Sequence, residues 1–226
     1  RHRLTVTSSR QLKAWWPNDT PSEVSVLHNG IDVEQWRFGA KGNGTAIWSG
    51  RITPNKGTHF AALAARKAGM SLIIYGAIED PDYWAAKVVP LLGADIRYGG
   101  HLASGQLAKE MAKASICLFT PCWDEPFGLV AAEAMACGLP VVAAGATGAA
   151  SLVKEGETGR LVAPGRPEVF APACADALAP YCLDDALRLA HGANGERAAR
   201  AYSWDVINQA VVDTYLRLLE ARRAAR

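Results

Sequence analysis

An alternation of apolar strand-like segments with helical segments begins at Thr45 and leaves few folds open to this chain. The strand-like segments are unbroken apolar runs, which is typical of strands covered by helices on both faces of a sheet. Strands that alternate with helices form right-handed βαβ units within an open parallel sheet. We therefore predict an α/β fold, a Rossmann-like open parallel sheet with helices on both faces, followed by carboxy-terminal helices.

The expected elements follow from apolar periodicity and from the turn residues between them. Strands are expected at residues 4–6, 23–27, 45–49, 71–75, 95–98, 115–119 and 139–143. Helices are expected at residues 8–16, 57–68, 81–92, 104–114, within 125–138, and at 167–179, 184–201 and 205–221. After Gly159 only helices are expected, and Ser203 is predicted to cap the last of them.

The loops that carry polar motifs follow Ser49, Tyr75, Tyr98 and Phe119, each at the end of an expected strand. Ligands of open parallel sheets bind at the carboxyl ends of the strands. These loops are therefore predicted to meet at one edge of the sheet and to form a single site.

The stretch DEPFGLVAAEAMACGLPVVAA, residues 124–144, contains a short helix that starts near Pro126 and ends at Gly138. Proline near a helix start and glycine just past its end are the usual placements. The first amides of a helix have no intrahelical partner and therefore form a ready anion site. The amides expected to form this site belong to Phe127, Gly128, Leu129 and Val130.

Two carboxylates accompany this anion site. Glu125 precedes the helix, and Glu133 lies about one turn inside it, with a side chain that leans back toward the helix start. Carboxylates accept hydrogen bonds from vicinal hydroxyls. A ligand that is anionic in the middle and rich in hydroxyls at both ends fits this pattern, and a sugar nucleotide has that chemistry.

Two cations lie in the loop after the strand at 45–49. Arg51 and Lys56 flank a turn that contains Pro54 and Asn55. Together with the roughly half-unit positive charge of a helix start, they would neutralise a diphosphate. The alternative is that both are ordinary surface residues.

Three motifs occur in order along the chain. Glu125 and Glu133 form an E-x7-E pattern, residues 50–57 read Gly-Arg-Ile-Thr-Pro-Asn-Lys-Gly, and residues 28–32 read His-Asn-Gly-Ile-Asp. With these motifs the chain resembles the retaining glycosyltransferases of the GT-B fold, and especially glycosyltransferase family 4. The family often has a polar or charged loop where this chain has the small residues 143–148.

The resemblance implies roles for individual residues. Arg51 and Lys56 would contact the donor phosphates and stabilise the departing nucleotide, Glu125 would bind donor-sugar hydroxyls, and Glu133 would hold the ribose. Segment 97–101 could clamp the nucleobase, although Tyr98 could equally be a core residue. The predicted catalytic residues are Arg51, Lys56 and Glu125, and the predicted substrate-binding residues are Gly50, Tyr98, Phe127, Gly128, Leu129, Val130 and Glu133.

The resemblance also implies a division of the chain. Residues 1–20 are expected to be the remnant of an amino-terminal domain or the linker after it, residues 21–204 the nucleotide-sugar donor-binding domain, and residues 205–226 an amphipathic helix. The implied reaction is transfer of a hexose from a UDP-, GDP- or ADP-linked donor to an acceptor hydroxyl. The acceptor, a glycan, lipid or small molecule, would be bound by the missing amino-terminal domain.

Two other functions stay open. One is a non-catalytic nucleotide-sugar-binding subunit or sensor, and the other is a GT-B sugar-nucleotide epimerase. The net charge of +2 does not indicate a nucleic-acid partner. No apolar run is a transmembrane segment. The expected location is cytoplasmic, with peripheral attachment at the inner membrane as the alternative.

No cofactor and no metal are expected. Asp80-Pro81-Asp82 imitates a metal-binding Asp-x-Asp motif, but we interpret it as a helix start, where acids are favoured. His28 and His101 are interpreted as loop histidines. The cysteines are interpreted as buried thiols in a reducing compartment. They are Cys117, Cys122, Cys137, Cys174 and Cys182.

Overall fold

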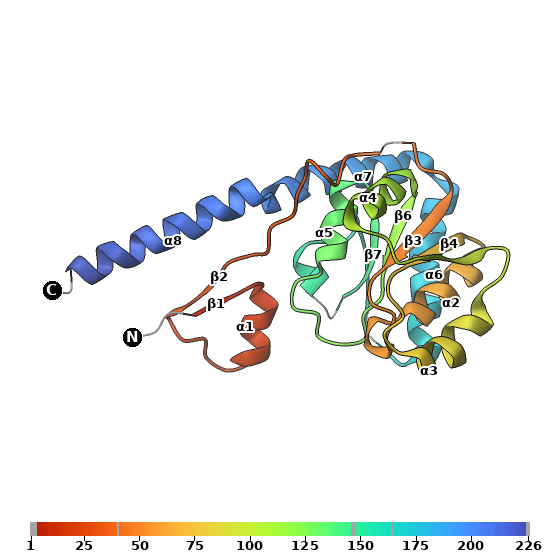
Figure 1. The fold of residues 1–226 in the computed structure, drawn as a ribbon, viewed down its shortest axis with the longest axis horizontal. Coiled ribbons are helices and arrows are strands. Elements are labelled where there is room, and N and C mark those ends of the chain that lie inside the picture. The colour runs from red at the N-terminus through yellow and green to blue at the C-terminus, as the bar shows by residue number, and fades with distance from the viewer. Residues whose placement is uncertain (1–3, 40, 146–147, 164, 225–226) are drawn as a thin grey trace.

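The computed structural model describes residues 4–39, 41–145, 148–163 and 165–224. Its centre is a six-stranded parallel sheet of order β5-β4-β3-β6-β7-β8, with helices on both faces (Figure 1). The strands are β3 (Thr45–Ser49), β4 (Ser71–Tyr75), β5 (Ile96–Gly100), β6 (Ile116–Phe119), β7 (Val141–Ala144) and β8 (Gly159–Val162). The predicted fold class is confirmed.

The order of the strands indicates where a ligand would bind. The chain builds outward from β3 through β4 to β5, then returns to the other side of β3 with β6 and continues to β7 and β8. This is the strand order of doubly wound nucleotide-binding folds, in which ligands bind where the order reverses. The reversal lies between β3 and β6, which are hydrogen-bonded neighbours.

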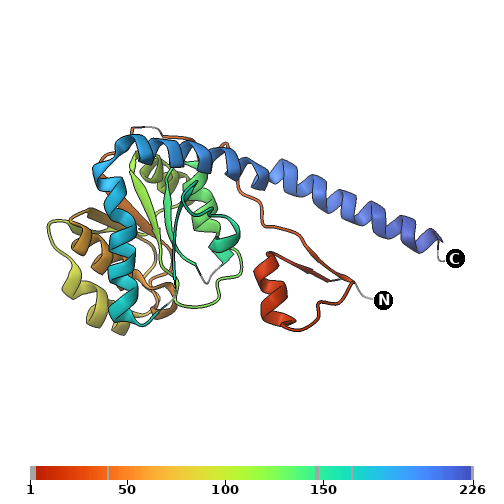
Figure 2. The same cartoon turned by 180° about the vertical axis from the view of Figure 1, so that it is seen from behind.

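Alternate side chains of the strands enter two apolar layers. On one face, α2 (Thr58–Ala68) and α6 (Pro167–Leu183) pack over residues such as Leu72 and Leu118. The other face is covered by α4 (Ser104–Lys113), α5 (Leu129–Ala136) and α7 (Asp185–Ala199). These helices share an apolar layer with strand residues such as Ile47 and Cys117 (Figure 2). Each buried aliphatic side chain contributes about 1.5–3 kcal/mol to folding, so both layers stabilise the sheet.

A small βαβ unit lies beside the main sheet. It comprises β1 (Leu4–Val6), α1 (Ser9–Trp15) and β2 (Val24–Val26), and its two strands pair in parallel with each other. Strand β2 follows residue 20, so the unit extends across the expected domain boundary at 20/21, and that boundary stays a prediction. Figure 1 shows that this unit lies apart from the six-stranded sheet and beneath the long last helix.

The last helix, α8 (Trp204–Ala224), extends away from the main body over the small unit (Figure 1). The amide of Val206 donates to Ser203 Oγ at 3.3 Å, which confirms the predicted cap. The amide of Ile31 donates to the Tyr202 carbonyl at 2.8 Å, and that of Trp204 to the Ile31 carbonyl at 3.1 Å. These bonds fix the start of α8 on the segment that leaves β2.

Two expectations about secondary structure were wrong. Residues 81–92 form α3 (Pro81–Tyr83), a π turn (Trp84–Val88) and a 3-10 turn (Val89–Leu91) instead of one helix. Pro90 lacks an N–H and so removes one of the hydrogen bonds that a regular helix would make there. Strand β8 was not expected, because its first two residues, Gly159 and Arg160, leave it only two apolar residues. Gly159 is required there, since a Cβ would collide with the Val141 carbonyl of the neighbouring strand.

The structure also corrects a helix end and two cysteines. Helix α6 continues through Pro180 to Leu183, four residues past the predicted end. Cys122 and Cys182 are exposed, whereas the other three cysteines are buried as predicted. Among the helices of the described residues, none is long and apolar enough to cross a bilayer.

Candidate functional site

A cavity of about 290 Å³ opens at the carboxyl ends of β3 and β6, beside the start of α5. It occupies the reversal in strand order, where ligands of such sheets bind. Of the predicted site residues, all but Tyr98 and Glu133 line it. The lining residues are Asn29, Trp48, Ser49, Gly50, Arg51, Lys56, Phe119, Thr120, Pro121, Glu125, Pro126, Phe127, Gly128, Leu129 and Val130.

The start of α5 presents amide groups to this cavity. Gly128 is the N-cap residue, with a φ of 93°. Ala131 and Ala132 donate the first hydrogen bonds of the helix, both to the Gly128 carbonyl, at 2.9 and 3.3 Å. The amides of Leu129 and Val130 precede these first donors, and both residues line the cavity. The helix start therefore has the donor geometry of an anion site.

Contacts from two sides hold the loop at 124–127 that precedes α5. The Gly148 amide donates to the Glu125 carbonyl at 2.6 Å. From the small unit, Ser8 Oγ donates to the Pro126 carbonyl, and Arg10 Nε lies 2.9 Å from Asp124 Oδ1. The loop is therefore fixed both to the main domain and to α1. Ala146 and Thr147 of the small-residue loop lie outside the described residues.

His28 takes part in the same support. Its Nδ1 lies 2.9 Å from the Thr7 carbonyl. Its ring packs between Phe127 and Tyr202, with ring centres 5.8 and 5.3 Å away. The loop that precedes α5 is therefore joined, through an aromatic cluster, to the segment that leads into α8. His28 is a packed loop histidine in this structure, as the sequence analysis expected.

Lys56 and Glu125 form an ion pair at the wall of the cavity, with side chains that are 17% and 15% exposed. The indole Nε1 of Trp123 donates to Glu125 Oε2 at 2.9 Å. The Lys56 ammonium also lies 5.3 Å from the centre of the Trp123 ring. Arg51 is more exposed and pairs with Glu79 at 3.2 Å. Such a surface pair contributes little to stability, so Arg51 is available to a ligand.

A buried hydrogen-bond relay positions the backbone next to Lys56. Trp48 Nε1 donates to Thr120 Oγ1 at 3.1 Å, and Thr120 Oγ1 donates to the Gly57 carbonyl at 2.9 Å. Gly57 has a φ of 66°, and a Cβ there would collide with the Thr120 carbonyl. Glycine is therefore required at the residue after Lys56, because other residues are strained at this φ and have no room.

We expect Thr120→Val to lower the free energy of unfolding by about 1–3 kcal/mol, because it leaves the buried Trp48 N–H without its acceptor. Urea unfolding measures the change. Thr120→Ser is the control, since it keeps the hydroxyl and removes only the methyl group. If valine and serine destabilise the chain equally, the relay does not support the loop.

Glu133 lies in the second turn of α5, one turn past Leu129 and Val130. Burial raises the pKa of its carboxyl to about 7. Within the described residues it has no hydrogen-bond donor and no cationic partner. A half-buried carboxylate without a partner is costly to the folded protein, and such groups occur preferentially at functional sites.

A second cavity, of about 360 Å³, adjoins the first and shares Ser49, Gly50 and Arg51 with it. It extends to the ends of β4 and β5 and is also lined by His101. Tyr98 does not line either cavity: its ring packs against Trp84, and its hydroxyl donates to the Gly76 carbonyl at 2.8 Å. The position of Tyr98 therefore supports the core alternative and not the ligand contact.

The Asp80-Pro81-Asp82 segment begins a helix, as interpreted. Asp80 Oδ1 accepts a hydrogen bond from the Tyr83 amide at 2.8 Å and caps α3. Across the residues that the structure describes, no three His, Cys, Asp or Glu side chains are grouped so that they could hold a metal ion.

Sequence reasoning missed Thr120, Trp123 and Trp48. Thr120 could have been found, because it directly follows the apolar run of β6, at the end where ligands bind. Trp123 gave no signal beyond its position two residues before Glu125. The contact of Trp48 with Thr120 depends on strand pairing that the sequence does not specify.

The fold is a doubly wound α/β domain with a cavity at the start of α5. Residues 43–179 match the family model for group 1 glycosyl transferases. The match covers more than half of the chain, and the chain belongs to this family.

Individual relatives agree with this assignment. The chain is 32% identical to the D-inositol 3-phosphate glycosyltransferase of Actinosynnema mirum, over 93% of the chain and 55% of that protein. It is 29% identical to the phosphatidyl-myo-inositol mannosyltransferase of Mycobacterium tuberculosis, over 93% of the chain and 58% of that protein. The chain thus spans little more than half the length of these relatives.

A solved structure agrees as well. The crystal structure of HepE from Anabaena in complex with UDP-glucose superimposes with a TM-score of 0.80 at 25% identity. The similarity covers 94% of this chain and 63% of HepE.

Proposed function

We propose that this chain is the donor-binding half of a retaining glycosyltransferase of family 4, which transfers a hexose from a nucleotide sugar to an acceptor hydroxyl. The observation that carries the proposal is the convergence of Lys56, Glu125 and the first amides of α5 on one cavity. The HepE complex with UDP-glucose supports a sugar-nucleotide donor. Whether the donor is a UDP-, GDP- or ADP-linked sugar stays open.

In this proposal the diphosphate lies at the start of α5, where the amides of Leu129 and Val130 and the cations Arg51 and Lys56 face it. Glu125 binds hydroxyls of the sugar, and Glu133 binds the ribose. The nucleobase occupies the second cavity, between Gly76 and His101. The positive charges that surround the diphosphate supply the electrostatic stabilisation of the leaving group, so that no metal or cofactor is needed.

The family resemblance implies transfer on one face of the sugar. The bond between the anomeric carbon and the phosphate oxygen breaks, and the acceptor oxygen bonds to the same carbon. The acceptor proton passes to the departing phosphate oxygen. We propose that the acceptor site lies in an amino-terminal domain and that residues 1–20 are a remnant of that domain or the linker after it. Residues 21–204 would be the donor-binding domain, and residues 205–226 the carboxy-terminal amphipathic helix. The chain alone should then bind the donor but transfer sugar poorly. The proposed location of the protein is the cytoplasm.

Calorimetry with UDP, GDP and ADP and their glucose and mannose conjugates tests the proposal. Glu133→Ala is expected to weaken every nucleotide by about tenfold, since the lost bond involves a charged group. Glu125→Ala is expected to weaken only the additional affinity that the sugar provides. Equal losses for nucleotide and sugar nucleotide in both variants would contradict this division of roles.

Two measurements address the alternatives. Turnover of a sugar nucleotide without any acceptor would favour the epimerase. Donor binding without transfer, even when the acceptor domain is present, would favour the sensor or subunit.

A further inference from the structure

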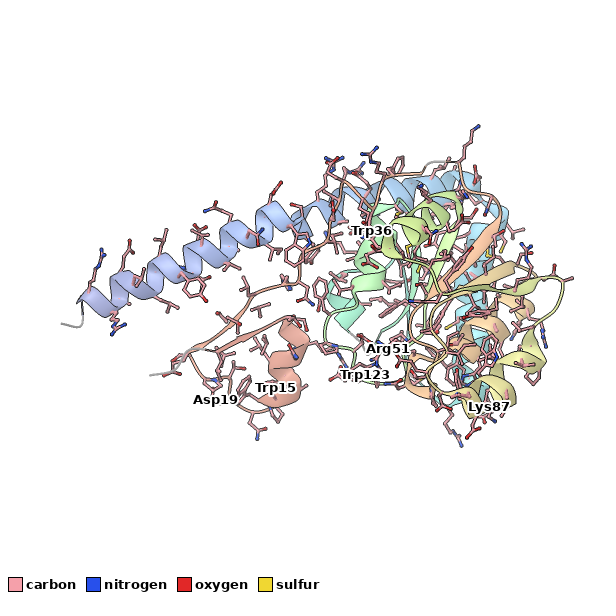
Figure 3. All side chains as sticks on the ribbon, in the orientation of Figure 1. Trp15, Asp19, Trp36, Arg51, Lys87 and Trp123 are labelled. Carbon is pink, nitrogen blue, oxygen red and sulfur yellow. The ribbon has the colours of Figure 1, made fainter. Side chains whose placement is uncertain are left out.

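Trp123 lies in the loop after β6, between the donor cavity and a separate apolar cavity of about 380 Å³. The ring lines the apolar cavity, together with Phe60 and Phe170, and it does not line the donor cavity. It is 40% exposed. Figure 3 shows Trp123 at the same end of the sheet as Arg51. Trp123 therefore contacts the Lys56–Glu125 pair without lining the cavity that this pair lines.

The polar edge of the indole contacts Glu125. Trp123 Nε1 and Lys56 Nζ both bond to Glu125 Oε2. Among the described residues, no donor is bound to Glu125 Oε1. Two donors on one oxygen hold the carboxylate in one orientation and leave the other oxygen to accept hydrogen bonds from a ligand.

The face of the same ring acts on the cation. Lys56 Nζ lies 5.3 Å from the ring centre, within the range of a cation–π interaction. The backbone around Trp123 is itself fixed, because the Cys122 amide donates to the Asn55 carbonyl at 2.7 Å. One residue therefore contacts both members of the ion pair from a loop that is tied to the turn before Lys56.

We propose that Trp123 is a positioning residue that orients Glu125 toward the hydroxyls of the donor sugar and holds Lys56 at the diphosphate. The proposal rests on the proposed function. Trp123 acts through Glu125 and Lys56 and does not touch the donor. Loss of its N–H should release the carboxylate, and loss of its ring should release the ammonium as well.

Three variants separate these effects. Trp123→Phe keeps a ring face for Lys56 and removes the N–H, Trp123→Leu removes both, and Trp15→Phe, on the exposed surface of α1, is the matched control. Calorimetry with UDP and UDP-glucose gives the ratio of the two affinities. We expect Trp123→Phe to reduce this ratio by about tenfold while UDP binding stays within about twofold. Trp123→Leu should also weaken UDP binding by about threefold.

A second measurement requires no donor. The indole N–H resonance of Trp123, identified as the one that Trp123→Phe removes, should shift in Glu125→Ala of the ligand-free chain and stay in place in Glu79→Ala. An unchanged resonance in Glu125→Ala, or an unchanged affinity ratio in Trp123→Phe, would overturn the positioning role. If the unmodified chain bound no sugar nucleotide, the proposed function would fail, and the resonance would still decide whether Trp123 holds Glu125.

Discussion

Replacing Lys56 by alanine is expected to weaken the binding of nucleoside diphosphates and of their sugar conjugates by about tenfold to a hundredfold. The variant removes a cation from the proposed diphosphate site and leaves the Glu125 carboxylate, which is 15% exposed, without its cationic partner. A largely buried carboxylate without a counter-charge is unfavourable and repels the phosphates. In an enzyme that includes the acceptor domain, kcat should fall by about 10²–10³-fold.

Calorimetry of the variant provides the measurement, and Lys87→Ala is the matched control. Lys87 is exposed on the turn at 84–88 (Figure 3) and lines neither cavity. Adding Glu125→Gln to Lys56→Ala should restore part of the nucleotide affinity, because it removes the unpaired charge. If Lys56→Ala and Lys87→Ala bound nucleotides equally well, Lys56 would not belong to the diphosphate site.

Replacing Glu133 by glutamine is expected to stabilise the ligand-free chain at pH 8 by about 1–3 kcal/mol and to weaken nucleotide binding by about tenfold. Burial raises the pKa of this carboxyl from its ordinary value of 4.5 to about 7 in the folded chain. The charged form is therefore disfavoured by folding. Its cost is absent below pH 4.5, grows as pH rises, and is fully present above pH 7.

Urea unfolding between pH 4.5 and pH 8 measures this effect. The wild-type chain should lose stability relative to Glu133→Gln as pH rises through this window, and the two should converge near pH 4.5. Glu168→Gln, at an exposed residue of α6, should give no such gain. A gain that is the same at every pH, or a loss at pH 8, would show that Glu133 is not a strained carboxylate. Nucleotide affinity of the wild type should rise between pH 6 and pH 8, since ribose hydroxyls donate to the charged form.

Most of the fold could be predicted because it depends on apolar patterns that are local in the sequence. Five of the six strands of the main sheet were predicted, and four of them, β3, β4, β6 and β7, contain apolar runs with turn residues between them. Strand β8 was not predicted, because Gly159 and Arg160 interrupt its short apolar pattern. Its pairing depends on the close approach of Gly159 to Val141, which the sequence does not show. The break in the helix expected at 81–92 was not predicted, because Pro90 lies in an otherwise helical pattern.

The candidate site divides in the same way. Arg51, Lys56, Glu125 and the start of α5 meet because the carboxyl ends of neighbouring parallel strands always share one edge of the sheet. Their approach could therefore be predicted from the order of the motifs. The contact of Trp123 with both members of the ion pair depends on side-chain conformations that only the packed structure determines. The sequence did not decide whether Tyr98 contacts a ligand or lies in the core, for the same reason.

We propose that a sugar nucleotide binds to this chain with its diphosphate at the start of α5 and with hydroxyls at both glutamates. A crystal structure of this chain soaked with UDP-glucose tests it most directly. We predict that phosphate oxygens accept hydrogen bonds from the amides of Leu129 and Val130 and from Lys56, with the sugar at Glu125 and the ribose at Glu133. A ligand bound away from this cavity, or bound there with Lys56 and the α5 amides turned away from the phosphates, would contradict the account.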